Sequence, residues 1–88
     1  MSNLNWKQDS TTLYRGFHKG NPPEEVGIIT HYYKHDFIWE SYKRVVINNE
    51  TNYVSIKGRC ASLTLAKESI ENAQVKLSRA IKVLLGII

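Results

Sequence analysis

The last third of the chain has the apolar spacing of one long α-helix. From Leu63 onward, apolar residues recur at intervals of three and four, at Leu63, Ala66, Ile70, Ala73, Leu77, Ala80, Leu84 and Ile87. This spacing places them on one face of a helix, with polar and charged side chains opposite. Ser62 stands directly before the pattern, where its hydroxyl can cap the first turn. The sequence therefore predicts a helix over residues 62–88.

The middle of the chain has the two-residue period of β-strands. Residues 37–47 form the longest alternating run, with two faces: Phe37, Trp39, Ser41, Lys43 and Val45 on one, and Ile38, Glu40, Tyr42, Arg44 and Val46 on the other. The asparagine-rich stretch 48–52 has turn chemistry, because asparagine tolerates positive φ. Residues 53–58 then read as the returning strand, so 37–58 is predicted to be a β-hairpin.

The N-terminal part is less regular. Residues 1–10 show no period, and we expect an irregular segment in which Trp6 packs back on the domain, since large aromatic side chains usually find cover. Residues 11–17 are β-branched and aromatic, and they predict a short strand.

Two interpretations fit residues 22–35. In the first, 18–27 is a loop broken by glycine and proline, 27–33 is a strand, and a tight turn follows. In the second, Asn21 caps a helix that starts at a proline. The first interpretation is favoured, because isoleucine, threonine and tyrosine are better strand formers than helix formers.

These elements predict an α+β fold, in which an antiparallel sheet of three to four strands packs on one long C-terminal helix. A chain of 88 residues is one domain. Its expected parts are the irregular segment 1–10, the β region 11–59 and the helix 62–88.

The composition of the chain indicates its cellular compartment and the kind of partner it could bind. The single cysteine, Cys60, excludes an intrachain disulfide and fits a reducing compartment, so we expect a cytoplasmic protein. No apolar run approaches the roughly 20 residues that span a bilayer, and no membrane partner is expected. The net charge of +4, from 12 basic and 8 acidic residues, is a mild balance that favours a polyanionic partner without requiring one.

No constellation of catalytic residues is recognisable. His31 and His35 would share a face on a helix, and His18 and Cys60 are the only further candidates for a zinc site. On strands this spacing has no such meaning. Nothing supplies a nucleophile with its base, or a glycine-rich phosphate loop. We therefore expect no enzyme activity, no metal and no cofactor.

The hairpin mixes aromatic and basic side chains, as nucleic-acid-binding sheets do. The candidate residues for binding a nucleic acid or a protein partner are Trp39, Tyr42, Lys43, Arg44, Tyr53, Lys57 and Arg59. The alternative is that one face packs on the helix and the other is an ordinary half-exposed sheet surface.

The end of the helix is apolar nearly all round. Such a segment needs cover, either from the N-terminal segment with Trp6 or from a second copy of the chain. A helix lying on a membrane is a weaker third option, because few basic residues border the apolar side. The residues expected at a homodimer or partner interface are Leu77, Ile81, Leu84, Leu85 and Ile88.

The stretch from about 37 to 73 carries a resemblance to known families. A strand ends at Gly58, a serine-capped turn follows at Ser62, and a helix begins with Ala66, Ile70 and Ala73. This pattern resembles the sheet-plus-helix DNA-binding domain of plant ethylene-response factors and the arm-binding domain of phage tyrosine integrases. The resemblance implies DNA reading by sheet residues, here at the positions of Trp39, Tyr42, Arg44 and Lys57.

In size and composition the chain also resembles small phage-encoded inhibitors of host defence, such as anti-CRISPR proteins. The resulting hypothesis is a small non-catalytic phage-type protein that acts in the host cytoplasm. It would inhibit a host defence or nucleic-acid-processing complex by direct protein binding. The alternative function is a nucleic-acid-binding module that contacts DNA or RNA through the basic and aromatic sheet face.

Overall fold

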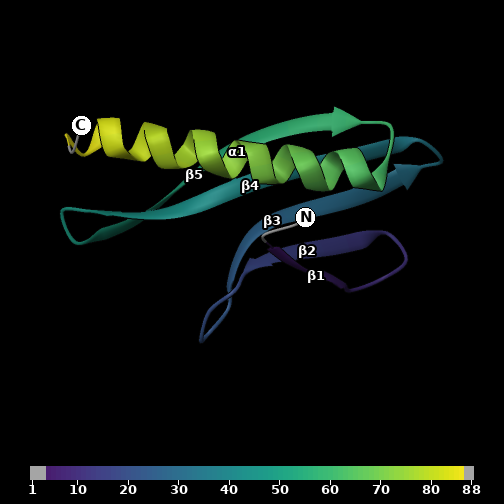
Figure 1. Ribbon diagram of the computed structural model, residues 1–88, viewed down its shortest axis with the longest axis horizontal. Helices are drawn as coiled ribbons and strands as arrows, with labels where there is room; N and C mark the ends of the chain where they lie inside the picture. Colours follow the sequence, from purple (N-terminus) through teal and green to yellow (C-terminus); the bar gives the residue numbers. More distant parts are fainter. Residues whose placement is uncertain (1–3, 87–88) are drawn as a thin grey trace.

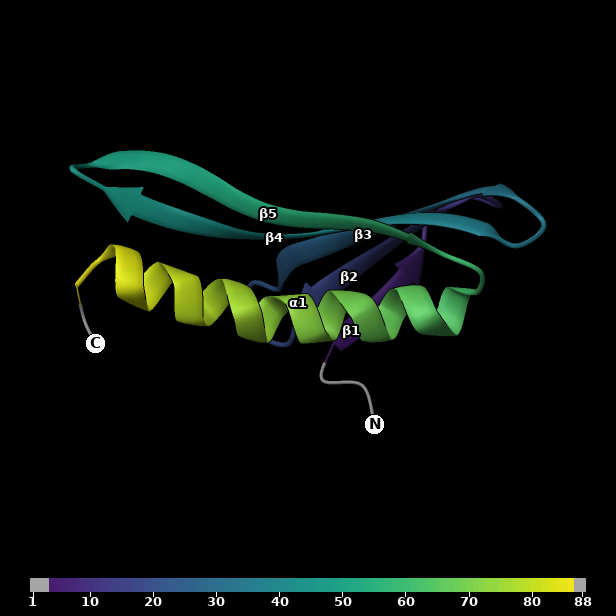
Figure 2. The ribbon, with the colours of Figure 1, turned by 90° about the horizontal axis from the view of Figure 1, so that it is seen from above.

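The computed structural model, which describes residues 4–86, is an α+β fold of one sheet and one helix (Figure 1). The sheet is antiparallel, and its strands follow one another in chain order. The elements are β1 (Leu4–Gln8), β2 (Leu13–His18), β3 (Glu24–Tyr33), β4 (Asp36–Ile47), β5 (Glu50–Cys60) and α1 (Leu63–Leu84). Figure 2 shows α1 lying along one side of the sheet. The fold class is as predicted, but the sheet has five strands rather than three to four.

The additional strand is β1, which falls in the segment predicted to be irregular. It pairs with β2 from Leu4↔His18 to Gln8↔Tyr14. Leu4 is buried, and Trp6 packs against the core as expected. The Trp6 ring lies over Gly16, where a Cβ atom would come within 2.8 Å of the ring. Only two apolar residues mark this strand, which is too few to show a period.

The interpretation of residues 22–35 as a strand is confirmed, and the helical interpretation is wrong. β3 starts at Glu24, so the preceding loop is shorter than the predicted 18–27. The hairpin of β4 and β5 is also confirmed, with strands longer than predicted. Its turn is Asn48 and Asn49, which have φ angles of 51° and 66°. Asparagine accepts this left-handed conformation more readily than most residues.

The helix begins where the sequence predicts it. The Ser62 hydroxyl accepts a hydrogen bond from the Leu65 amide at 3.2 Å, which is the expected N-cap. The helix ends at Leu84, earlier than the predicted 88, and residues 87–88 lie outside the described part. The buried face of α1 consists of Ala66, Ile70, Ala73, Gln74 and Leu77.

Ile70 is the centre of the contact between α1 and the sheet. It has no exposed surface, and a Cβ atom on Gly27 of β3 would lie 2.7 Å from its Cγ2 atom. Ile70 can therefore occupy this position only because residue 27 has no side chain. The Ser41 hydroxyl of β4 donates to the Ile70 carbonyl at 3.0 Å, which ties the helix to the middle of the sheet.

The sheet divides beside this contact. Pairing of β3 with β4 ends at Gly27↔Ser41, and β3 bends away while β4 continues (Figure 1). We call the opening between Val26 of β3 and Tyr42 of β4 the strand split. Gln74 of α1 reaches into it, and its Nε2 atom donates to the carbonyl oxygens of Val26 at 3.2 Å and Tyr42 at 2.9 Å. The helix thus satisfies two carbonyl groups that the ladder leaves unpaired.

Candidate partner-binding face

The alternation of β4 and β5 separates the predicted binding residues onto two faces. Trp39 and Lys43 lie on the helix side. The Trp39 ring packs against the core and over Gly58 of β5. The Lys43 Nζ atom lies 2.7 Å from the Ser78 hydroxyl of α1. The structure therefore does not bring these two residues together with the other five.

The remaining five predicted residues share the sheet face that points away from α1, which we call the outer face. They are Tyr42, Arg44, Tyr53, Lys57 and Arg59. Arg44 lies directly opposite Tyr53 in the ladder, and Lys57 lies opposite Glu40. No described element lies over this face (Figure 2). It is therefore open to a partner.

Most cations of the outer face are paired with carboxylates of the same sheet. Lys57 lies 3.8 Å from Glu40, and the nitrogen-to-oxygen distance from Arg59 to Asp36 is 3.0 Å. Exposed pairs of this kind contribute little to stability. They do, however, lower the positive potential that the basic residues would otherwise produce. Within residues 4–86, Arg44 has no ion-pair partner, which distinguishes it from these cations.

A second group of charges joins three strands across the outer face. Glu25 of β3 accepts a hydrogen bond from Arg15 of β2 at 2.6 Å, and its other oxygen accepts one from the Tyr42 hydroxyl of β4. Arg15 also donates to Asp9. Both hydrogen bonds raise the pKa of Arg15, and the bond to Glu25 has the larger effect.

Tyr42 of this group is half-buried. Burial raises the pKa of its hydroxyl well above the ordinary value, and the hydrogen bond to Glu25 raises it further. Tyr42 consequently stays a neutral donor at any physiological pH. Its hydroxyl therefore holds the Glu25 carboxylate by a hydrogen bond and does not act as a base.

The outer mouth of the strand split is a cleft of about 490 Å³. It is lined by Pro22, Pro23, Glu24, Glu25, Tyr42, Arg44 and Tyr53. The rings of Tyr42 and Tyr53 meet edge to face with centroids 6.4 Å apart. The cleft thus combines two aromatic rings with the unpaired guanidinium of Arg44. Its volume falls in the range of ordinary ligand pockets.

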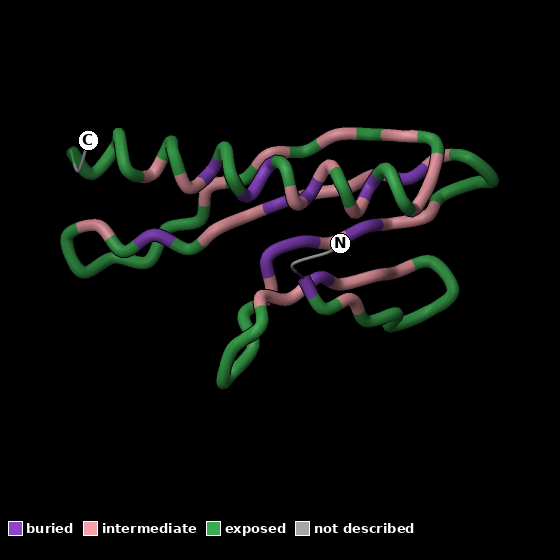
Figure 3. The backbone as a smooth tube through the Cα atoms, in the orientation of Figure 1, coloured by how far each residue is buried: buried purple, intermediate pink, exposed green. Residues whose placement is uncertain are grey.

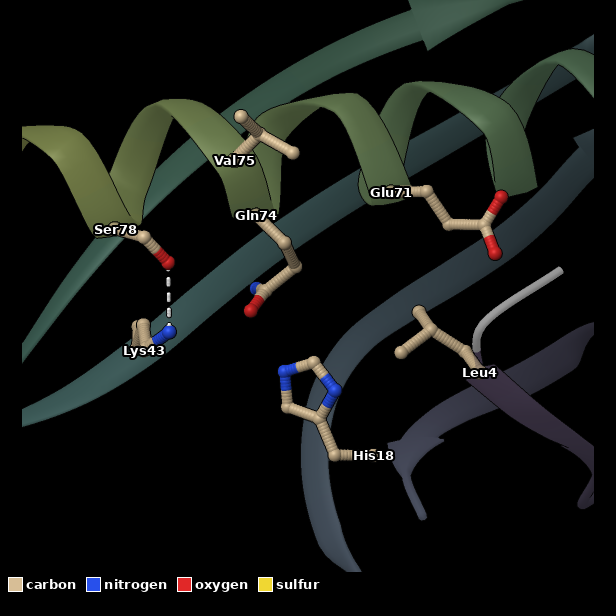
Figure 4. A pocket seen from close by; sticks show the side chains of 7 residues that line it. All are labelled: Leu4, His18, Lys43, Glu71, Gln74, Val75 and Ser78. Atoms are coloured by element: carbon tan, nitrogen blue, oxygen red, sulfur yellow. Dashed lines mark hydrogen bonds between the residues drawn. The ribbon is translucent and has the colours of Figure 1, made fainter.

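The helix side of the split holds a smaller pocket of about 190 Å³. Figure 4 shows the side chains that line it: Leu4, His18, Lys43, Glu71, Gln74, Val75 and Ser78. The Gln74 side chain points from α1 toward the space between Lys43 and His18 (Figure 4). Gln74 is 6% exposed, and its Oε1 atom is buried without a hydrogen-bond partner. A buried acceptor in this state is unusual in a folded protein.

The sequence did not point to Gln74, which lines the helix-side pocket, or to Glu25, which lines the outer cleft and is bonded by Arg15. Arg15 and Glu25 are 10 residues apart, and Glu25 and Tyr42 are 17 apart. Their meeting depends on a register shift between β2 and β3 at Gly16 and Phe17. No local pattern signals such a shift.

The histidines that we weighed as metal ligands have other surroundings. The His31 ring stacks on Phe37 at 4.1 Å between centroids, and its Nε2 atom lies 3.3 Å from the Lys34 carbonyl oxygen. His35 lies in the turn between β3 and β4. Among residues 4–86, no three histidine, cysteine or carboxylate side chains gather as a metal site would require.

The apolar end of α1 is only partly covered. Leu77 is buried in the core, which removes it from the predicted interface, and Ile81 is half-buried. Leu84 and Leu85 are exposed at 62% and 43%. Figure 3 shows this end of the helix coloured mainly as exposed. Ile88 lies outside the described residues. No helix in the described chain has the length and apolar character needed to cross a membrane.

Of the two alternatives for cover, the one with Trp6 is wrong for this end of the helix. Trp6 instead lies beside the first turns of α1, with the Lys67 Nζ atom 5.5 Å from its ring centroid. A homodimer through Ile81, Leu84 and Leu85 stays a prediction, which the mass of the chain in solution would decide. Its interface would be smaller than expected, because the Leu77 side chain is buried in the core of its own chain and cannot contact a second copy.

Comparison with known proteins adds no relative: no family model matches the chain, and no curated protein or solved structure is significantly similar to it.

Proposed function

We propose that this chain is a non-catalytic binding protein that holds a protein partner on its outer face. The observation that carries the proposal is the pairing of the outer-face cations with carboxylates of the same sheet. It leaves an aromatic surface with nearly balanced charge. Protein interfaces are enriched in tyrosine and arginine at their centres and are depleted in lysine, aspartate and glutamate there. Tyr42, Tyr53 and Arg44 form such a centre beside the cleft of the strand split.

The alternative, a nucleic-acid-binding sheet, fits this arrangement less well. Phosphate contacts supply most nucleic-acid affinity and need cations that are free to release counterions. Lys57 and Arg59 would first have to leave Glu40 and Asp36. Arg44 is then the only hairpin cation on the outer face that is available without such a rearrangement. The further candidate, Lys43, lies on the other face against Ser78.

The identity of the partner is a narrower hypothesis. A component of a host defence or nucleic-acid-processing complex is the partner that the resemblance to small phage-encoded inhibitors favours. This part of the proposal rests on that resemblance alone. It would fail if the chain, produced in cells under phage challenge, left defence activity unchanged.

A nucleic-acid mobility-shift titration tests the choice between the two functions. We expect no discrete complex with mixed-sequence duplex DNA, single-stranded DNA or RNA at physiological salt. Any low-salt binding should be weak and should disappear with increasing salt, since few phosphates can be neutralised. A tight complex that persists at physiological salt and is lost on Arg44→Ala would contradict the proposal.

The variant Glu40→Gln is the control for this titration. It removes the carboxylate beside Lys57 and leaves the rest of the outer face unchanged. If ion pairing is what suppresses nucleic-acid binding, this variant should bind more tightly at low salt than the unmodified chain. Equal binding of both chains would show that the pairing of Lys57 is not the cause.

A further inference from the structure

We propose that the partner is bound by strand addition: an extended peptide segment enters the strand split and pairs with the edge of β4 that β3 leaves open. The inference rests on the proposed function, because it specifies how a protein partner uses this part of the sheet. Three features of the split support it: the unpaired edge, the two pockets and the charge at the outer mouth.

The first feature is the backbone of β4 beyond Ser41. In an antiparallel sheet, successive residues direct their N–H and C=O groups to opposite neighbours. The Nε2 atom of Gln74 donates to both the Tyr42 carbonyl and the Val26 carbonyl of β3. The Tyr42 carbonyl must therefore be directed toward the β3 side. Arg44 and Val46 therefore direct their backbone groups to the same side. No described residue of β3 pairs with them, since the ladder ends at Gly27↔Ser41.

The second feature is the position of the two pockets. One strand of peptide places alternate side chains on opposite faces of a sheet. The cleft of about 490 Å³ borders Arg44 on the outer face, and the pocket of about 190 Å³ borders Lys43 on the helix side. Neighbouring side chains of an added segment would thus each meet a cavity. Main-chain bonds with pockets for alternate side chains are the usual basis of peptide recognition by strand addition.

The third feature defines the chemistry of the segment. Arg44 is the outer-face cation without a carboxylate. The outer cleft is also lined by Glu24 and by Glu25, which Arg15 and Tyr42 already bond. An acidic side chain of the segment therefore has its place at Arg44, where a guanidinium can form two parallel hydrogen bonds. On the helix side, Gln74 Oε1 is a buried acceptor that lacks a donor. A small side chain with a hydroxyl or amide donor suits the inner pocket. The expected segment is therefore extended, with an acidic residue next to a small hydrogen-bond donor.

The test uses a phage-displayed library of linear peptides of about seven residues, enough for one strand, selected against the full chain. Each enriched peptide is then measured by calorimetry against Val46→Pro and Val46→Ala. Proline removes the N–H group at the open edge, where a strand tolerates it, whereas alanine removes the same side chain and keeps the N–H. We expect Val46→Pro to weaken binding at least about tenfold, equivalent to about 1.4 kcal/mol, relative to Val46→Ala.

A second measurement avoids dependence on the folding of the proline variant. Selected peptides carrying one N-methyl group at alternate backbone positions are tested against the unmodified chain. Strand addition predicts loss of binding at every second position only. Equal binding by Val46→Pro and Val46→Ala, or tolerance of N-methylation at every position, would overturn it.

Three further outcomes bear on this inference and on the proposed function. If peptides lose binding on Tyr53→Ala but not on Val46→Pro, the outer face is a binding surface and strand addition is wrong. If no peptide is enriched, or enriched peptides are insensitive to both changes, the inference fails and the proposed function loses its support. If the unmodified chain and Val46→Ala are dimers in solution without peptide and Val46→Pro is a monomer, the added strand comes from a second copy. The inference of a foreign segment is then overturned.

Discussion

Ile70→Ala is expected to lower the free energy of unfolding by about 3 kcal/mol, within the range for large-to-small changes in a core. Ile70 has no exposed surface and fills the space above Gly27. The Ser41 hydroxyl holds the helix at this position, so the cavity left by the substitution should collapse only in part. For a domain of this size the loss is a large fraction of the total stability. Urea denaturation followed by tryptophan fluorescence gives the value.

Leu65→Ala is the matched control for this experiment. It removes a side chain of the same size from the same helix, but Leu65 is 49% exposed. Its effect should stay within about 0.5 kcal/mol, as for other surface substitutions. If the two variants were equally stable, the buried face of α1 would be assigned wrongly.

Gln74→Glu is expected to make the stability of the chain depend strongly on pH. At neutral pH it would bury a carboxylate against the carbonyl oxygens of Val26 and Tyr42, which now receive hydrogen bonds from the amide. Leaving a buried charge uncompensated costs about 3–5 kcal/mol. The carboxyl group should therefore have a raised pKa in the folded state.

The sign of the pH dependence follows from that raised pKa. Below the unfolded pKa of about 4.3 the carboxyl group is protonated in both states, and the charge penalty is absent. As the pH rises above this value, the unfolded chain loses its proton first, so the variant loses stability relative to the unmodified chain. Urea midpoints of both chains measured from acidic to neutral pH check this. A stability difference independent of pH would show that position 74 is not buried beside these carbonyl groups.

The helix, its cap and the long hairpin could be predicted because each has a local signature. Ser62 precedes the helical period directly, and Asn48 and Asn49 supply the turn chemistry of β4 and β5. β1 lacks such a signature, since its stability comes from pairing with β2 and from the contact between Trp6 and Gly16. Both depend on residues that are distant in the sequence.

The candidate site was predicted only in part for a related reason. Alternation shows which residues of β4 share a face, but it does not show which face the helix covers. Trp39 and Lys43 were therefore grouped with Tyr42 and Arg44, although they lie on opposite sides of the sheet. The strand split depends on where β3 leaves β4, which is a property of the three-dimensional register.

Photo-crosslinking from the outer face tests the binding of a protein partner most directly. A photoreactive phenylalanine derivative would replace Tyr53 on the outer face or, as a control, Leu65, an exposed residue of α1. We expect irradiation of cells in which the chain is naturally produced to give a discrete protein adduct from position 53 that survives nuclease treatment. We expect no such adduct from position 65. An adduct at position 53 that nuclease removes, or a discrete protein adduct from position 65 alone, would contradict a protein-binding outer face.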